Sequence, residues 1–375
     1  MDLLIKNGHV IDPAQGIDEV LNVYLKDHKV RYIGKDSPDA EREIDAEGLY
    51  VFPGLIDFHS HVAYTGNEFS INPAYFIPHG ITATVDAGTT GCLNYEAFLH
   101  SVIDHSPILI KTYINAFGGG IVSDDIVEQY NITHWERMEE ILEKHRDNIL
   151  GLKYRYIDGI GTYESFRDAI KFAHSHGVHM CVHTAAPCTE LDRLLELMEK
   201  DDVFTHMYHH RGKDNILNAD GTDVKGSVKA ARERGVIFDL GNGNANFAFD
   251  VCIPAVKAGF WPDIIATDMT KLKINLHHCV KNLPNLMAKF LELGMPLPEI
   301  IRSVTETPAR LMGLEGKIGT LKAGAKADVA IFRLAEKNFD VCDVNGEKLR
   351  CRKLFLPVMT VIDSDIAYCA GDFTL

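Results

Sequence analysis

The chain alternates apolar and polar residues in one way near its two ends and in another way between them. Over residues 1–53, short apolar runs such as Leu3-Leu4-Ile5 alternate with turn residues, a pattern typical of a small sheet. Residues 319–375 have the same texture, with apolar runs separated by Gly, Asp and Asn. In the middle of the chain, apolar runs of strand length recur with helix-like segments between them. Two of these segments, 135–144 and 191–198, space their apolar residues three and four apart, as outer helices do.

The strand-length runs of the middle region end about one strand-plus-helix unit apart. We place eight strand ends near His61, Ala87, Asn115, Arg155, His183, His206, Leu240 and Asp268. Eight consecutive βα units predict an α/β fold in which residues 54–318 form a (β/α)8 TIM barrel. Residues 1–53 and 319–375 show no core of their own. We therefore expect these two segments to pair as a small composite β-sandwich domain beside the barrel.

The composition excludes several classes of function. The chain has 375 residues, of which 46% are hydrophobic, and it can therefore bury a large core. Its 38 basic and 53 acidic residues give a net charge of −15, which repels nucleic-acid backbones and anionic membrane surfaces. The beginning of the chain lacks a signal-peptide pattern and no apolar run reaches the length of a membrane span, so we expect a cytoplasmic protein. The eight cysteines lack the spacing of a disulfide framework. The sequence leaves open whether the chain forms a homo-oligomer.

Two histidines flank one serine where the apolar run 51–58 ends. In His59-Ser60-His61, residues two apart on a strand point to the same face, so both imidazoles can reach one ion if that face lines a cavity. Imidazole favours zinc or a similar metal. Alone, such a pair is a weak signal, because most pairs of this kind on surface loops bind nothing. The rest of the chain decides whether it binds a metal.

Other predicted strands also end in residues that can ligate a metal, at the edge where barrels carry their reactive groups: Lys153, His183, His206 and Asp268. A single histidine in such a place is more often a hydrogen-bonded core residue, but the joint occurrence favours a metal site. Lys153 would lose its charge when desolvated, and a neutral amine can capture carbon dioxide. The resulting carbamate has two oxygens suited to bridge two metal ions about 3.5–4 Å apart. The alternative for Lys153 is an ion pair with a carboxylate at the barrel rim.

These residues stand in motifs that resemble the amidohydrolase superfamily, specifically its binuclear metal hydrolases, which include dihydroorotase, D-aminoacylase and related deacetylases. The resemblance covers nearly the whole chain. It rests on segment 53–61, on segment 79–88, on the tail segments 307–314 and 319–328, and on four ligand-type residues in order, Lys153, His183, His206 and Asp268.

The resemblance implies a ligand set and a mechanism. His59 and His61 with Asp268 would hold one divalent ion, His183 and His206 would hold the other, and carboxylated Lys153 would bridge the two, with zinc as the leading candidate metal. A hydroxide bridging the ions would be the nucleophile, and one ion would polarise the scissile carbonyl. Asp268 would act as the general base and then as the general acid.

The substrate is expected to be a small molecule that carries a carboxylate. Charge counting leaves the expected metal site with a net positive charge, and Arg155, on the same strand face as Lys153, could add a fork for a carboxylate. An ordinary rim salt bridge is an equally good explanation of Arg155. Tyr208 or Arg211, both in the loop after the His206 strand, is a candidate substrate contact. Segment 151–155 is similar to a branch of deacetylases that act on N-acyl or O-acyl groups next to an α-carboxylate.

Three alternatives stay open. A cyclic amide hydrolase of the dihydroorotase kind would share the metal frame. A purine-type deaminase would usually hold one metal and carry a glutamate shortly after His183, where this chain has Thr184-Ala185-Ala186. A non-catalytic barrel scaffold would be expected to lose ligands, and all six positions are filled here. Related sequences often carry a histidine where this chain has Gly241-Asn242-Gly243, and the role of that segment is open.

Overall fold

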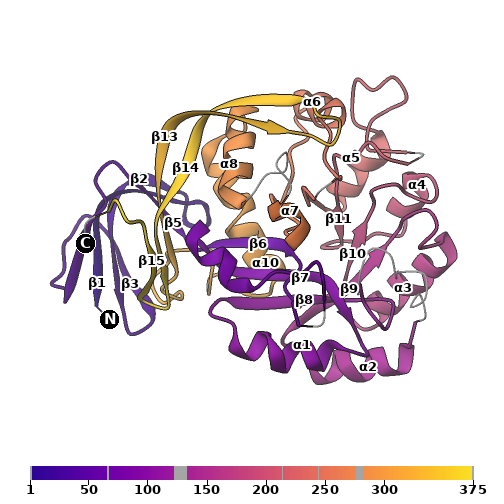
Figure 1. Cartoon of the computed structure of the whole chain (residues 1–375), viewed down its shortest axis with the longest axis horizontal. Coiled ribbons are helices and arrows are strands. Elements are labelled where there is room, and N and C mark those ends of the chain that lie inside the picture. The colour runs from indigo at the N-terminus through magenta and orange to yellow at the C-terminus, as the bar shows by residue number, and fades with distance from the viewer. Residues whose placement is uncertain are drawn as a thin grey trace.

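The computed structural model describes residues 2–65, 67–121, 133–212, 214–243, 245–275 and 282–373, and all structural statements concern these residues. Their centre is a seven-stranded sheet of parallel neighbours that follow one another in chain order (Figure 1). Its strands are β6 (Leu55–Ser60), β7 (Ile81–Gly91), β8 (Leu109–Asn115), β9 (Ile149–Arg155), β10 (His179–His183), β11 (Val203–Thr205) and β12 (Ile237–Asp239).

The eighth strand expected to end at Asp268 is not an extended strand. Two single parallel bridges, Asp239 to Ile264 and Ser60 to Met269, join this segment to β12 on one side and to β6 on the other. Asp268 has a φ of 51°, which takes the chain out of the extended conformation at the point where the strand was expected to end. The expectation of eight regular strands was therefore wrong in this detail, although the segment lies where it was expected.

Helices connect the parallel strands and cover the outside of the sheet (Figure 1). Buried Met138, Ile141 and Leu142 line one side of α2, and the Thr162 side chain caps α3 in a capping box with Ser165. The helices are α1 (Tyr95–Ser101), α2 (Trp135–Lys144), α3 (Tyr163–Ser175), α4 (Leu191–Leu195), α5 (Gly226–Glu233), α6 (Phe249–Lys257), α7 (Lys271–Asn275), α8 (Leu283–Glu292), α9 (Leu297–Ser303) and α10 (Glu306–Leu311). None of the helices in the described ranges combines the length and apolar character that a membrane crossing requires.

The two ends of the chain share a second, mixed sheet beside the parallel one. Its order is β15-β14-β13-β5-β1-β2-β3, with β4 paired to β1, and β13 runs antiparallel to β5. Its strands are β1 (Leu3–Asp12), β2 (Ile17–Lys26), β3 (Lys29–Gly34), β4 (Arg42–Asp45), β5 (Tyr50–Pro53), β13 (Val329–Cys342), β14 (Lys348–Ile362) and β15 (Asp365–Cys369). The strands form one connected sheet, and the sandwich packing stays a prediction.

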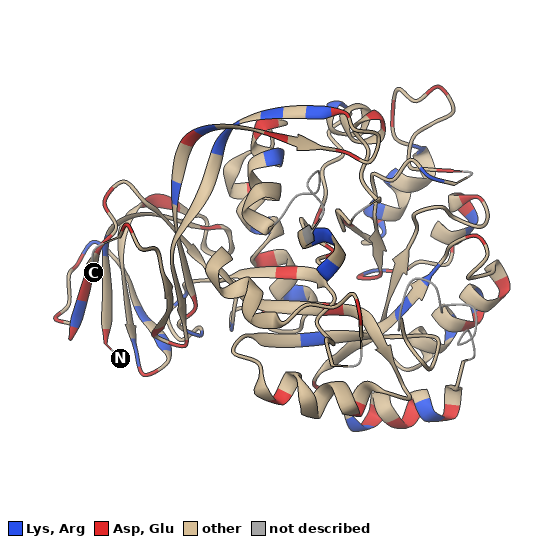
Figure 2. Cartoon of the chain, viewed as in Figure 1, with Lys and Arg blue, Asp and Glu red and all other residues tan. Residues whose placement is uncertain are grey.

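The β13–β14 hairpin extends beyond the mixed sheet and passes over α8 to reach α6 (Figure 1). At its tip, Asp343 Oδ2 accepts a hydrogen bond of 2.8 Å from the Phe249 backbone at the start of α6. In Figure 2, positions of basic and of acidic residues both occur along this hairpin and along the outer helices. The hairpin thus connects the mixed sheet to the end of the parallel sheet where the predicted ligands lie.

Candidate metal centre

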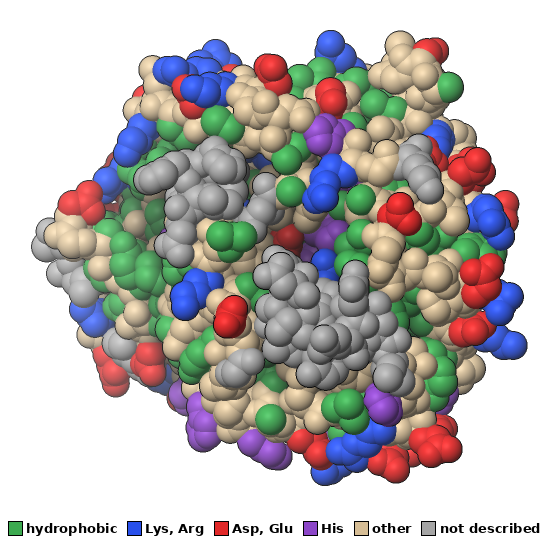
Figure 3. Space-filling model, turned by 45° about the vertical axis from the view of Figure 1, so that its right-hand side comes forward, with side chains coloured by type: hydrophobic (Ala, Val, Ile, Leu, Met, Phe, Trp, Pro, Cys, Tyr) green, Lys and Arg blue, Asp and Glu red, His purple; other side chains and the backbone are tan. Residues whose placement is uncertain are grey.

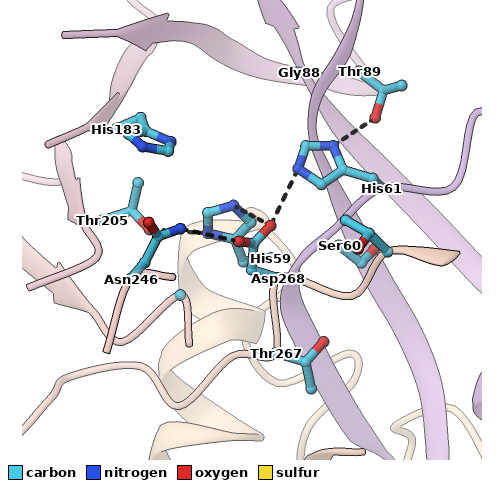
Figure 4. Close-up of polar contacts among 12 residues, drawn as sticks. His59, Ser60, His61, Gly88, Thr89, His183, Thr205, Asn246, Thr267 and Asp268 are labelled. Atoms are coloured by element: carbon cyan, nitrogen blue, oxygen red, sulfur yellow. Dashed lines mark hydrogen bonds and ion pairs between the residues drawn. The ribbon is translucent and has the colours of Figure 1, made fainter. Parts of the chain in front are cut away.

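His59, His61 and Asp268 lie together at the carboxyl end of the parallel sheet (Figure 4). One ligand atom from each residue lies within 4.8 Å of the others. Asp268 Oδ1 is 3.2 Å from His61 Nε2 and 3.5 Å from His59 Nε2. His59 belongs to β6, His61 follows that strand directly, and the bridge from Ser60 to Met269 brings Asp268 beside them. The alternation along β6 and the bridged eighth segment therefore create this three-residue group.

The ring of His59 is held from behind. Its Nδ1 is 2.7 Å from Asp239 Oδ2 at the end of β12 and 2.9 Å from Thr205 Oγ1 at the end of β11. A carboxylate can only accept, so Nδ1 carries the proton and Nε2 keeps its lone pair toward Asp268. This support fixes both the orientation and the tautomer of a metal-binding histidine.

The ring of His61 is held through a hydroxyl. Its Nδ1 is 2.8 Å from Thr89 Oγ1, which in turn donates to Asp86 Oδ2 at 2.8 Å. Since the threonine proton goes to Asp86, the threonine oxygen accepts from Nδ1, and His61 Nε2 is also left with its lone pair facing Asp268. The two histidines of this half therefore present the same ring nitrogen.

The other predicted ligands lie on the three neighbouring strands or directly after them. His206 Nδ1 is 2.6 Å from the Gly241 carbonyl oxygen, so it donates and leaves Nε2 as an acceptor. That Nε2 is 2.9 Å from His183 Nδ1. Lys153 is buried on β9, and its Nζ donates to Cys181 Sγ at 3.5 Å. The rings of His59 and His206 have centroids 5.2 Å apart, so the two halves are neighbours.

The buried surroundings keep these imidazoles neutral. Burial is the main cause that lowers the pKa of His59, His183 and His206, and the charge of Lys153 lowers each of them further. Burial by itself would raise the pKa of Asp268, and positive charge at the ring nitrogens of His59, His61 and His206 lowers it well below its ordinary value. With these rings neutral, a bound cation would supply that charge. Neutral imidazole and ionised carboxylate are the forms that bind a divalent metal.

Asp57 fixes the backbone that presents Asp268. Its Oδ1 accepts from the Thr267 backbone N–H at 3.0 Å, and its Oδ2 accepts from the Thr267 hydroxyl at 2.5 Å. The Asp268 N–H donates to the His59 carbonyl at 2.7 Å. Burial raises the pKa of Asp57 to about 7. These bonds stabilise the left-handed conformation of Asp268 that ends the eighth segment.

A pocket of about 360 Å³ opens in front of the two histidine groups. Its lining includes His61, His183 and Asp268 together with two arginines, Arg155 and Arg211. The remaining wall is largely apolar, with Phe69, Ile121, Ile157, Ile160, Ala185, Ala186, Ala245 and Leu272. Figure 3 shows the hollow with histidine and acidic side chains inside it. The size suits a small organic molecule.

Comparison with known proteins agrees with this site. The model of the amidohydrolase family matches residues 50–368. The chain belongs to the amidohydrolase family. A deacetylase of Agrobacterium fabrum is 30% identical over 348 residues, which cover 90% of this chain and 84% of that relative.

Two solved structures also resemble this member of the amidohydrolase family. A dihydroorotase structure has a TM-score of 0.88 at 27% identity and covers 100% of this chain and 99% of its own. An adenine deaminase structure has a TM-score of 0.89 at 28% identity, and the match covers 98% of this chain and 100% of the deaminase chain. These neighbours imply a TIM-barrel fold, and the protein is a hydrolase that acts on carbon–nitrogen bonds.

The donor set fits the binuclear metal centre that is typical of the amidohydrolase family. His59, His61 and Asp268 offer two fixed imidazole nitrogens and a carboxylate oxygen, a combination that zinc accepts. His183 and His206 turn ring nitrogens toward each other, so that a second ion could lie near both. Lys153 is buried on β9 and pairs with Cys181 on the neighbouring strand β10, which ends at His183.

Tyr208, one of the two candidate substrate contacts of the loop after His206, is not among the residues that line this pocket. The side chain is fully buried, and its hydroxyl donates to the Phe260 carbonyl at 2.7 Å. Its ring lies against Phe247 and Phe290. The loop after His206 instead brings Arg211 to the pocket. The reason is that Tyr208 follows His206 within a buried turn whose side chains pack into the core.

Sequence reasoning missed the residues that support the ligands of this amidohydrolase. Asp239 and Thr205 end their strands, and Thr89 and Asp86 lie within β7, but none is of a type or spacing that marks a metal site by itself. Asn246 was missed as well, although its Nδ2 is 3.5 Å from Asp268 Oδ2 and it lines the pocket. The available signal was Asp239, which directly precedes Leu240, the predicted end of the seventh strand.

In the Gly241-Asn242-Gly243 segment, the backbone passes very close to the predicted metal ligands. Both glycines have positive φ, 41° and 56°. A Cβ on Gly241 would lie 2.8 Å from His206 Nδ1, and one on Gly243 would lie 2.6 Å from Asp268 Oδ2. Only glycine leaves room for the chain to pass this close to the ligands.

Proposed function

We propose that this amidohydrolase removes an acyl group, as an amide or an acetyl ester, from a small substrate that bears an α-carboxylate. The observation that carries the proposal is a single pocket. It is lined by Asp268 and two of the predicted ligand histidines and also by Arg155 and Arg211. Guanidinium groups match the planar geometry of a carboxylate. The deacetylase relative at 30% identity supports acyl transfer to water as the reaction.

The residues divide the work by position. His59, His61 and Asp268 would hold one divalent ion, and His183 and His206 would hold the second. Carboxylated Lys153 would bridge the two ions. Bound metal ions supply Lewis acidity and activate water for attack on the acyl carbon. Zinc is the proposed metal, since imidazole and carboxylate ligands suit it.

Proton transfer is assigned to Asp268. Its low pKa means that the carboxylate is ionised at neutral pH and can accept the proton that the attacking water releases. The same carboxyl then returns the proton to the leaving nitrogen or oxygen. The Asn246 amide lies beside Asp268 Oδ2 and helps to orient it. Arg155 and Arg211 would hold the substrate carboxylate so that the acyl group faces Asp268.

The test is hydrolysis by the purified enzyme of N-acetyl and O-acetyl α-carboxylic acids of both hands, each paired with its neutral carboxamide. We expect turnover of the acids, and we expect Arg155→Met to raise KM for the acids about 10- to 100-fold while the carboxamides change little. Arg167→Met on the outer side of α3 is the matched control. Equal KM changes for acids and carboxamides would contradict the carboxylate assignment.

A cyclic amide hydrolase is the second candidate, because a dihydroorotase structure is similar over the whole chain. Ring opening of cyclic amides without hydrolysis of the acyclic panel would favour it. Release of ammonia from aminopurines would favour the deaminase alternative, to which the adenine deaminase structure gives support.

A further inference from the structure

Lys289 is a lysine inside the protein core. It lies on α8 and is 1% exposed, among buried neighbours on that helix such as Leu286, Met287 and Phe290. Moving an ammonium group out of water is unfavourable unless it finds partners. A leucine or methionine would satisfy the packing of α8 at this position without that penalty. The position therefore calls for an explanation other than stability.

The two nearest partners of Lys289 belong to the loop that follows β12, here called the β12 loop (residues 241–243 and 245–248). The Lys289 Nζ donates to Asn242 Oδ1 at 2.6 Å. It also lies 3.3 Å from the centroid of the Phe247 ring, a cation–π contact. The amine thus contacts the loop near both of its ends.

The β12 loop touches both halves of the metal centre. The Gly241 carbonyl accepts from His206 Nδ1 at 2.6 Å, one residue before Asn242. Asn246, one residue before Phe247, places its Nδ2 3.5 Å from Asp268 Oδ2. A second anchor, the β13–β14 hairpin tip, holds the far end of the loop, where Val344 N–H donates to the Phe247 carbonyl at 3.1 Å.

We propose that Lys289 is a positioning residue of this hydrolase: through Asn242 and Phe247 it holds the β12 loop so that Asn246 faces Asp268 and the Gly241 carbonyl faces His206. This inference rests on the proposed function, because the reaction is one of its readouts. Lys289 is not among the residues that line the pocket, and its hydrogen bond and its shortest ring contact go to the loop. Burial also lowers the pKa of Lys289 to about 7, which shows how unfavourable the site is for the charge.

The experiment replaces each end of the contact in the full-length, metal-loaded enzyme. Lys289→Met keeps the volume and removes the amine, Asn242→Ala removes the acceptor, and the double variant tests whether the two act through one bond. Lys257→Met, an exposed lysine at the end of α6, is the control. Four properties are measured: kcat and KM on the best substrate of the acyl panel, metal content, melting temperature, and amide hydrogen exchange of the peptide containing Asn242 and Phe247.

We expect Lys289→Met to keep its metal content and to melt at or above the wild-type temperature. Its kcat should fall at least tenfold with a smaller change in KM, and exchange in the loop peptide should rise at least tenfold. Asn242→Ala should lose kcat to a similar degree, and the double variant should lose little more than either single variant. This combination separates positioning from a structural role, because stability and activity move in different directions.

Two results would overturn the inference. One is a parallel fall of melting temperature, metal content and kcat, which would make Lys289 a structural residue. The other is an unchanged kcat together with unchanged loop exchange. If wild-type enzyme hydrolyses nothing in the panel, the proposed function fails, while the exchange and melting data still decide whether Lys289 holds the loop.

Discussion

The two halves of the metal centre are organised in different ways. In the half that contains Asp268, the barrel itself fixes both imidazoles, since Asp239 supports His59 and Thr89 supports His61. In the half that contains Lys153, His206 relies on a loop carbonyl, and His183 Nδ1 is bonded to His206 rather than to a supporting group. The first half is preorganised by strands, whereas the second depends on the β12 loop and, in the proposed function, on Lys153 as a ligand after carboxylation.

The strongest test of the preorganised half is Asp268→Asn. The change keeps the size of the side chain but removes the proton acceptor and the charge, so kcat should fall by about 10³-fold or more while KM changes far less. Asp168→Asn, on the exposed side of α3, is the control. Steady-state kinetics on the acyl panel give the result, and unchanged turnover would remove the proton-transfer role from Asp268.

The modified lysine provides the next largest effect. Lys153→Ala should lower metal content from about two ions per chain toward one and reduce activity about 10²- to 10³-fold, because the bridging oxygens are lost. Short carboxylic acids added to this variant should restore part of both. Metal analysis and kinetics on the same samples check this, with Lys111→Ala on β8 as the control. Full occupancy in Lys153→Ala would contradict the bridging role.

The sequence predicted the fold well because its strongest signals are local. Apolar runs gave the barrel strands, and β8, β9 and β10 end at the predicted residues Asn115, Arg155 and His183. The eighth strand could not be predicted correctly, since the φ of Asp268 depends on the bonds between Thr267 and Asp57, far apart in the chain. Pairing of the two chain ends was expected from texture alone, and β5 and β13 pair in the structure.

The ligands could be predicted, but the groups behind them could not. His59, His61 and Asp268 have a side-chain chemistry that marks a metal site, and the structure brings them together. Asp239 and Thr89 are common residues, and their role arises only from the contacts that the fold creates with His59 and His61. The burial of Tyr208 could not be predicted either, because loop membership says nothing about which way a side chain packs.

Those supporting groups give a third, smaller test of the comparison. Asp239→Asn should weaken metal binding about 10- to 100-fold, because the amide no longer fixes the His59 tautomer. Thr89→Val should act in the same direction, since it removes the only hydroxyl that His61 Nδ1 contacts among the described residues. Competition with a metal-binding chromophore measures both affinities. If neither variant changes them, the barrel does not preorganise this half.

The smallest expected effect concerns the support of the second half, through Lys289 and the β12 loop. The Lys289 pKa is lowered from 10.5 to about 7 in the folded protein, so between these values the unfolded chain holds a proton that the folded chain has released. The free energy of unfolding therefore rises with pH in this window, by about 1 kcal/mol from pH 7 to 8. Lys289→Met has no such proton to release. Urea unfolding at the two pH values should show the gain in the wild type and not in the variant, and equal gains would mean that Lys289 keeps an ordinary pKa and that the loop is held without an energetic penalty.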